Sequence, residues 1–369
     1  MASSYYIPAL ALSLIATGCA NSIFTKYQDQ QTVPSGGTFT QPVLQTLQMF
    51  IGESCALLFF YFQFKLYSTP EYDRLTPSPL SDGKPPITRR ATYLLAIPAA
   101  CDLAGTTMMN LGLIYTPVSI YQMIRGALIL FVALFSVVFL RRKISRVEWL
   151  SLFIVVIGIT IVGLSGKKSQ EKKDDSAFEL IFGIMLILLG QIFTASQFVV
   201  EEHILSKFTI EPLKLVGYEG SFGVALTFAG MIILYVLLGV NNKGPFDMVN
   251  SFEEMFSNSA ILYSSIAIMI SICSFNFFGV TITSKLSATA RSTIDTCRTM
   301  LVWFVSLALG WETFSAIQLS GFACLVFGTL VFNGAIEVQE GWLPAWFFED
   351  QLAKVHVVDT LIDEQIERS

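Results

Sequence analysis

Residues 121–140 read YQMIRGALILFVALFSVVFL, a run of twenty residues in which Arg125 carries the only charge. As a helix, about twenty residues cover roughly 30 Å, which is the thickness of the hydrocarbon core of a bilayer. A guanidinium at that depth costs at least about 2.5 kcal/mol, so it usually faces a polar cavity or a partner charge. A second stretch of this kind, near residues 287–309, carries Arg298. Together the two stretches predict a membrane protein with a pathway for a polar solute.

The composition of the whole chain agrees with this interpretation. Of the 369 residues, 53% are hydrophobic and 14% are charged, and the mean hydropathy is +0.61. A soluble domain would carry roughly a quarter charged residues. The net charge of −5 argues against a nucleic-acid partner. The fold class that follows is an all-α polytopic membrane protein.

Apolar windows along the chain predict ten transmembrane helices. The connections with even numbers carry more Lys and Arg, for example at 141–146, which places them and both termini in the cytosol. The ten spans lie at about 5–25, 42–66, 91–113, 117–140, 145–165, 178–202, 212–239, 259–283, 287–309 and 313–335.

The spans also repeat at an offset of 170 residues. Five spans per copy is an odd number, so the two copies have opposite topology and a site is expected at their interface near mid-depth. We therefore predict two inverted five-helix repeats at 1–166 and 178–336, a non-cytosolic linker at 167–177, and a cytosolic acidic tail at 337–369. The aligned landmarks include Pro42 with Pro212, Ser136 with Ser306, Ser145 with Ser315, and Gly158 with Gly328.

Residues 121–140 and 286–299, the latter reading LSATARSTIDTCRT, resemble the drug/metabolite transporter superfamily, specifically the F branch of solute carrier family 35. Shorter matching pieces are GES at 52–54, PAACD at 98–102, VEE at 200–202, GYEG at 217–220 and FNFFG at 275–279. The resemblance covers residues 1 to about 336. It implies the fold of ten helices in two inverted repeats and a location in endomembranes such as the lysosome, vacuole or Golgi.

Charged residues in the ninth span are the first candidates for a binding site. Arg291, Asp295 and Arg298 are spaced i, i+4, i+7, so they lie on one helix face and Asp295 can pair with either arginine. Under the repeat offset, Arg125 corresponds to Asp295. One interpretation is that Arg125, Asp295 and Arg298 line a cavity and bind solute. The other is that Arg125 and Asp295 form a permanent buried pair that fixes helix register.

Other polar residues complete the candidate site. Asp102 is a further candidate for solute binding, and Asp102, Glu53 and Glu219 are candidates for proton coupling, since a buried carboxylate can bind and release a proton. The alternative for these acids is a counter-ion or a helix cap. The neutral residues Ser119, Gln122 and Asn276 either bind solute or join helices. Glu201 and Glu202 lie at the cytosolic end of a span, where we expect them to be solvated.

Signatures of enzymes and ATP-driven pumps are missing from the sequence. The two histidines are too few for a His-based metal site or triad, and no GxxxxGK[ST] motif occurs. We expect no cofactor and no enzyme activity. The arginines favour a secondary-active transporter of a small anionic or zwitterionic solute. The alternative is a transporter-fold scaffold or receptor that moves no solute. Membrane lipid surrounds the chain, and association into a homodimer remains open.

Overall fold

The computed structural model describes residues 2–33, 37–39, 41–67, 84–116, 118–169, 174–236, 248–310, 315–334 and 336. Within these ranges the regular structure is helical, and β-structure is limited to isolated bridges such as Thr32 with Thr38. The acidic tail predicted at 337–369 and part of the predicted linker, residues 170–173, lie outside the described residues.

The helices follow one another in chain order. They are α1 (Ala2–Asp29), α2 (Pro42–Tyr67), α4 (Arg89–Thr92), the 3-10 helix η1 (Tyr93–Leu95), α5 (Ala96–Tyr115), α6 (Val118–Arg125), α7 (Leu128–Leu140), α8 (Arg146–Ser169), α9 (Asp174–Lys207), α10 (Pro212–Leu234), α11 (Met248–Ser257), α12 (Ser259–Lys285), α13 (Ala288–Ala308) and α14 (Ala316–Phe332).

Seven helical segments in the described ranges are long and apolar enough to cross a membrane. Large apolar side chains on their outer faces are exposed, for example Leu58, Phe62 and Ile270. Such surfaces suit a lipid environment and not water, so this is an integral membrane protein. The segments are Tyr6–Asp29, Pro42–Phe62, Arg89–Tyr115, Ile120–Leu140, Phe178–Lys207, Pro212–Ile233 and Ser259–Lys285.

The helices α13 and α14 are outside this set for different reasons. The helix α14 is apolar but only 17 residues long. The helix α13 buries Arg291, Asp295 and Arg298 along with several Thr and Ser side chains, which lowers its hydropathy. The count of ten transmembrane helices therefore remains a prediction.

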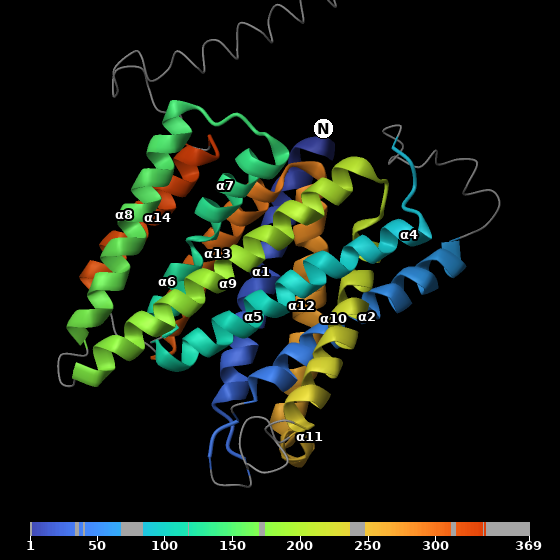
Figure 1. The fold of residues 1–369 in the computed structure, drawn as a ribbon, viewed down its shortest axis with the longest axis horizontal. Coiled ribbons are helices and arrows are strands. Elements are labelled where there is room, and N and C mark those ends of the chain that lie inside the picture. The colour runs from blue at the N-terminus through green and yellow to red at the C-terminus, as the bar shows by residue number, and fades with distance from the viewer. Residues whose placement is uncertain are drawn as a thin grey trace, which may run out of the picture.

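The helices pack in pairs that are distant in sequence. The helix α1 packs on α12, α2 on α10, α5 on α9, α7 on α13, and α8 on α14. Figure 1 shows α8 and α14 at one side of the molecule and α2 and α10 at the other, with the remaining pairs between them. This arrangement surrounds a central region with helices from both ends of the chain.

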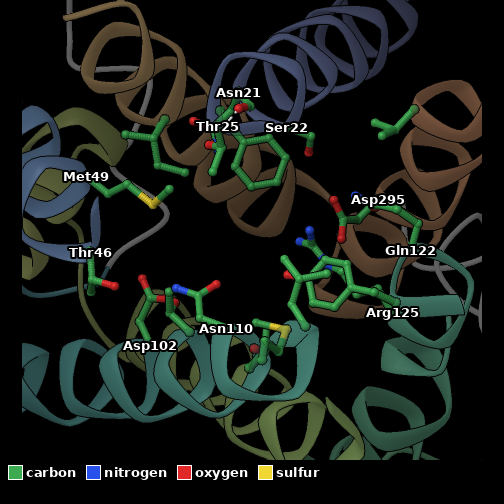
Figure 2. A pocket seen from close by; sticks show the side chains of 18 of the residues that line it. Asn21, Ser22, Thr25, Thr46, Met49, Asp102, Asn110, Gln122, Arg125 and Asp295 are labelled. Atoms are coloured by element: carbon green, nitrogen blue, oxygen red, sulfur yellow. Dashed lines mark hydrogen bonds between the residues drawn. The ribbon is translucent and has the colours of Figure 1, made fainter. Parts of the chain in front are cut away.

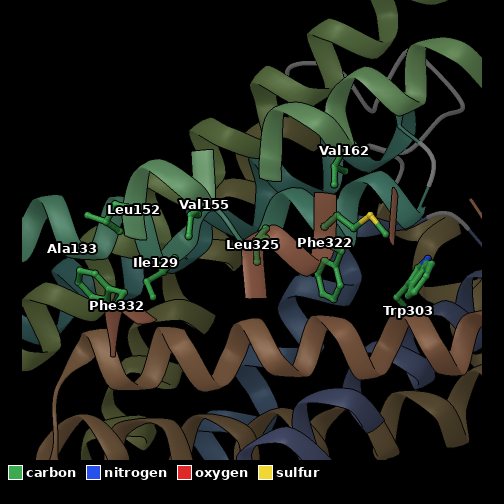
Figure 3. Packing of buried hydrophobic residues seen from close by; sticks show 10 residues of the cluster. Ile129, Ala133, Leu152, Val155, Val162, Trp303, Phe322, Leu325 and Phe332 are labelled. Carbon is green, nitrogen blue, oxygen red and sulfur yellow. The ribbon is translucent and has the colours of Figure 1, made fainter. Parts of the chain in front are cut away.

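Glycines allow the closest helix approaches. A Cβ on Gly158 of α8 would lie 2.6 Å from the carbonyl oxygen of Gly321 on α14, so only glycine fits there. Gly105 and Gly112 of α5 face Gly190 and Gly183 of α9 in the same way. An apolar cluster beside the α8–α14 contact, drawn in Figure 3, consists of Met123, Ile129, Ala133, Leu152, Val155, Val162, Trp303, Phe322, Leu325 and Phe332.

The predicted span at 117–140 is interrupted. The helix α6 ends at Arg125, and α7 begins at Leu128. Between them the backbone N–H of Gly126 donates to the carbonyl of Met123 at 3.0 Å, and that of Ala127 donates to Ile124 at 2.8 Å. These tighter i to i−3 bonds replace the α-helical pattern. The interruption directly follows Arg125, as in discontinuous transmembrane helices that form binding sites.

Candidate solute-binding cavity

A cavity of about 190 Å³ lies in the centre of the helix bundle. Side chains from α1, α2, α5, α6, α7, α9, α12 and α13 line it, so both predicted repeats contribute. Figure 2 shows Arg125, Gln122 and Asp295 along one wall and Asp102 and its neighbours along the opposite wall. The cavity therefore has Arg125 beside Asp295 on one wall and the carboxylate of Asp102 on the wall opposite.

Most of the predicted site residues meet at this cavity. Its lining includes Arg125, Asp295, Gln122, Asn276, Asp102 and Glu53. Arg298 and Glu219 lie behind the lining, where both are buried. Ser119 belongs to α6, but its side chain lies outside the described part of the structure.

Arg298 joins helices and does not face the cavity. Its Nε donates to Oδ1 of Asp295 at 2.6 Å, and its NH1 donates to the Ser22 hydroxyl of α1 at 2.9 Å. Its guanidinium also lies over the ring of Phe275, 5.1 Å from the centroid. A side chain at Gly18 would collide with Arg298, so this glycine makes room for the arginine. Arg298 thus holds Asp295 in place at the cavity wall.

Arg125 has a different environment. Its guanidinium lies 5.6 Å from the centroid of the Tyr121 ring. In the described part of the chain, Arg125 forms no ion pair at contact distance. Asp295 is in contact with Arg298 and interacts with Arg125 only at longer range. The permanent Arg125–Asp295 pair considered from the sequence is therefore not formed. Arg125 remains a cation at the wall of a polar cavity.

Arg291 forms a second buried ion pair. Its NH1 lies 2.5 Å from Oε2 of Glu201, and the two side chains are 1% and 0% exposed. The Arg291 guanidinium also lies over the ring of Phe198, 3.8 Å from the centroid. The expectation that Glu201 is solvated was wrong, because α9 and α13 pack so that Arg291 covers the carboxylate. Glu202 is also partly buried, and it accepts a hydrogen bond from the backbone N–H of Ala288 at 2.9 Å.

Hydrogen bonds connect this ion pair to the cavity. NH2 of Arg291 donates to Oδ1 of Asn276 at 3.1 Å. Nδ2 of Asn276 in turn donates to Oε1 of Glu53 at 2.6 Å. Glu53 and Asn276 line the cavity, whereas Arg291 and Glu201 lie behind it. The amide of Asn276 therefore links a cavity carboxylate to the buried pair.

Carboxyl groups from α2, α5, α9 and α10 outnumber the cation that lies among them. Glu53 and Asp102 interact electrostatically with each other and with Glu201, and Glu219 interacts with all three. Arg291 is the cation that these carboxylates share. Among the described residues, Oε1 of Glu219 has no hydrogen-bond partner. Four carboxylates with one guanidinium require protons or an incoming cation for neutrality.

Lys26 and Asp29 line the cavity and were missed from the sequence. The predicted first span ended at residue 25, but α1 continues to Asp29. Oδ1 of Asp29 accepts a hydrogen bond from Gln45 at 2.5 Å, which ties α1 to α2. Ser22, Lys26 and Asp29 are spaced i, i+4, i+7, so their shared helix face was a signal that could have identified them.

Known proteins similar to this chain include an uncharacterized protein and members of solute carrier family 35. The model of the nucleotide-sugar transporter family matches residues 87–273. An uncharacterized protein of Schizosaccharomyces pombe is 39% identical over 332 residues, covering 89% of this chain and 98% of that protein. Human solute carrier family 35 member F6 is 34% identical over 345 residues, covering 90% of each chain.

A solved crystal structure supports the fold. It superposes with a TM-score of 0.57 at 10% identity, covering 89% of this chain and 99% of that one. At this identity the likeness concerns the fold alone. The sequence matches decide the family: the chain belongs to the nucleotide-sugar transporter family, on the F branch of solute carrier family 35, and is a transporter and not an enzyme.

Proposed function

We propose that this protein is a secondary-active transporter that moves a small polar organic solute, anionic or zwitterionic, across an endomembrane by alternating access. The observation that carries the proposal is the central cavity, which is built from both ends of the chain and lined by charged groups. Charges at bilayer depth are costly unless they serve a polar pathway. In this proposal the membrane is that of the lysosome, vacuole or Golgi, and both termini are cytosolic.

The proposed architecture is ten transmembrane helices in two inverted repeats, at 1–166 and 178–336, joined by the linker 167–177. The helix pairs support it. If α6 and α7 count as one span, a rotation that exchanges the two repeats places α5 on α12 and α9 on α1. The α5–α9 pair thereby becomes the α12–α1 pair. The pairs α2–α10, α7–α13 and α8–α14 convert into themselves. A pseudo-twofold axis between inverted repeats produces this pattern.

Equivalent helix starts give independent support for the repeat. Pro42 and Pro212 are the first residues of α2 and α10. The hydroxyl of Ser145 accepts from the backbone N–H of Glu148 at the start of α8, and Ser315 caps α14 in the same way. The capping residues are 170 positions apart, as the repeat requires.

In the proposed site, the side chains that contact solute are those at the cavity wall. They are Arg125, Gln122, Asp102, Asn276 and Asp295. Arg298 acts through Asp295 as a positioning residue, because its own contacts are with Asp295 and α1. The assignment of Ser119 remains a prediction from sequence.

Proton coupling is proposed at Glu53, Asp102 and Glu219. The support is that Glu53 and Glu219 are buried, Asp102 is partly buried, and the three interact with one another and with Glu201. Arg291 is their shared cation, and Asn276 donates a hydrogen bond to Glu53. Uptake measured with and without an imposed pH gradient tests this. The expected result is gradient-stimulated uptake by the wild-type protein. Equal uptake in both conditions would refute proton coupling but not transport.

The transport proposal is tested with the purified full-length chain in proteoliposomes. The solutes are radiolabelled nucleotide sugars, nucleotides, nucleosides, amino acids and small peptides. We expect uptake of at least one class, and Arg125→Gln should reduce it at least tenfold, since one lost charge-assisted contact is worth roughly 1.5–3 kcal/mol. The matched control is Arg142→Gln, which removes an exposed arginine and should leave uptake unchanged.

Two outcomes would contradict the proposal. Undiminished uptake after combined loss of Arg125, Asp295 and Arg298 would remove the site assignment. Absence of uptake of every solute by a stably folded wild-type protein would favour the scaffold or receptor alternative, in which Arg125→Gln has no effect on partner binding.

A further inference from the structure

We infer that the transported solute is a zwitterion, bound with its anionic group against Arg125 and its ammonium group against Asp102 and Glu53. This inference rests on the proposed transport function and names the substrate class for the same cavity. It depends on how the charges of the cavity wall are already paired inside the protein.

The anionic group of the solute is assigned to the α6 wall. Arg298 is in contact with Asp295, whereas Arg125 forms no contact ion pair among the described residues and interacts with Asp295 only at longer range. Gln122, one turn before Arg125, is 7% exposed and lines the same wall. A carboxylate or phosphate at this wall would accept hydrogen bonds from the planar guanidinium of Arg125, whose geometry matches such anions.

The ammonium group of the solute is assigned to the opposite wall. Asp102 accepts a hydrogen bond from the Thr106 hydroxyl at 3.2 Å, and Glu53 accepts one from Asn276 at 2.6 Å. Both donors are neutral groups. The cation that interacts with both carboxylates, Arg291, is paired with Glu201 at 2.5 Å. An ammonium group offers three donors and one positive charge. It would supply the neutralisation that this wall lacks.

The α6 wall with Arg125 and the opposite wall with Asp102 and Glu53 together disfavour solutes that carry only one kind of charge. A pure anion would place its far end against Asp102 and Glu53. A pure cation would lie against Arg125 without a group that accepts hydrogen bonds from the guanidinium. A site built around buried charged partners discriminates strongly against analogues that lack one of them. The volume of about 190 Å³ is also below the roughly 300–1,000 Å³ of sites for drug-sized ligands. A compact zwitterion, of the size of an amino acid, fits both properties.

The experiment uses matched solutes that differ in charge and by one small blocking group. Each set holds a zwitterion, its N-acetyl form without the cation, and a form without the anion, which is the amide or ester of a carboxylate and the triester of the phosphate. The zwitterions are L-glutamine, glycylglycine and phosphoethanolamine, which separate carboxylate from phosphate and short from long spacing. Binding is measured by the shift in melting temperature of the purified full-length chain, and transport by competition for uptake into proteoliposomes.

The expected result is that the zwitterion of at least one set binds at least tenfold more tightly than its N-acetyl form and its amide or ester. Asp102→Asn should abolish the preference over the N-acetyl form, and Arg125→Gln should abolish the preference over the amide or ester. Arg142→Gln should preserve both preferences. The melting temperatures of the unliganded variants verify that each one is folded.

The inference is overturned if every zwitterion behaves like its N-acetyl form, or if no member of any set binds. A nucleotide sugar or nucleotide that is taken up while all three sets fail would overturn the zwitterion assignment and leave the transport proposal standing. Loss of uptake of every solute would instead remove the transport proposal itself, so the two failures are distinguishable.

Discussion

Replacement of Arg291 by methionine should strongly destabilise the folded protein. The guanidinium is 1% exposed and lies 2.5 Å from a carboxylate oxygen of the fully buried Glu201. Its loss leaves Glu201, Glu53, Asp102 and Glu219 without the cation that they share. Removal of one partner of a buried pair costs roughly 3–5 kcal/mol. We expect the upper part of that range, because several carboxylates lose their counter-charge at once.

Replacement of the ion-pair partner, Glu201, should destabilise the folded protein less. In Glu201→Gln the remaining carboxylates, and Asn276 through its hydrogen bond, still surround Arg291. We expect a cost of roughly 1–3 kcal/mol, which is that of one unsatisfied buried group. The double variant Arg291→Met/Glu201→Gln should be more stable than Arg291→Met alone, since it removes a charge that has no partner. The coupling energy from the double-mutant cycle should be at least about 1 kcal/mol.

Thermal unfolding of the purified full-length chain measures these differences. At about 2 °C per kcal/mol for a large chain, Arg291→Met should lower the melting temperature by roughly 8–10 °C. The matched control is Arg142→Met, an exposed arginine that donates to the Thr289 hydroxyl at 2.6 Å, with an expected cost below about 1 kcal/mol. The buried pair is refuted if Arg291→Met has the same melting temperature as the control. It is also refuted if the stability changes of the two single variants add up to that of the double variant.

Two further predictions concern packing and capping. In Gly158→Ala the new Cβ would lie 2.6 Å from the Gly321 carbonyl oxygen, so α8 and α14 must separate and the melting temperature should fall. The control is Gly230→Ala in α10, because a Cβ at Gly230 would have no heavy atom of the described residues within 4 Å. This control should be neutral or stabilising by up to about 1 kcal/mol. Ser287→Ala removes the hydroxyl that caps α13 by accepting a hydrogen bond from the Ala290 N–H at 3.1 Å, which should cost about 1 kcal/mol of stability. Ser287→Asp should retain the stability of the wild type. Equal melting temperatures of the wild type and both variants would exclude a capping role.

The positions of most helices could be predicted from the sequence. Hydrophobic windows and helix-capping residues are local properties, so the starts of α2 and α10 at Pro42 and Pro212 agree with the predicted spans. The ends were less accurate where polar residues continue a helix. The helix α1 extends past Lys26 to Asp29, because the side chains there face the cavity and α2 and not bulk water.

The break after Arg125 could not be predicted. The residues of 121–140 have no proline and only one glycine, so hydropathy indicates one continuous helix. The structure replaces α-helical bonds at Gly126 and Ala127 with tighter ones. A Cβ on Gly126 would lie 2.7 Å from the Leu325 side chain of α14, so the turn is adapted to a contact with a helix two hundred residues later in the chain.

The sequence by itself determined that the chain is an α-helical membrane protein and that Arg125, Asp102 and Asp295 lie inside its spans, because hydropathy and helical spacing are read along one segment. Only the tertiary structure decided which charges are paired. On α13 the spacing allowed Asp295 to pair with Arg291 or Arg298, and it pairs with Arg298. Arg291 pairs with Glu201 instead, 90 positions away. Such a choice depends on which helix faces pack together, since a buried charge pairs with whatever partner the fold brings within reach.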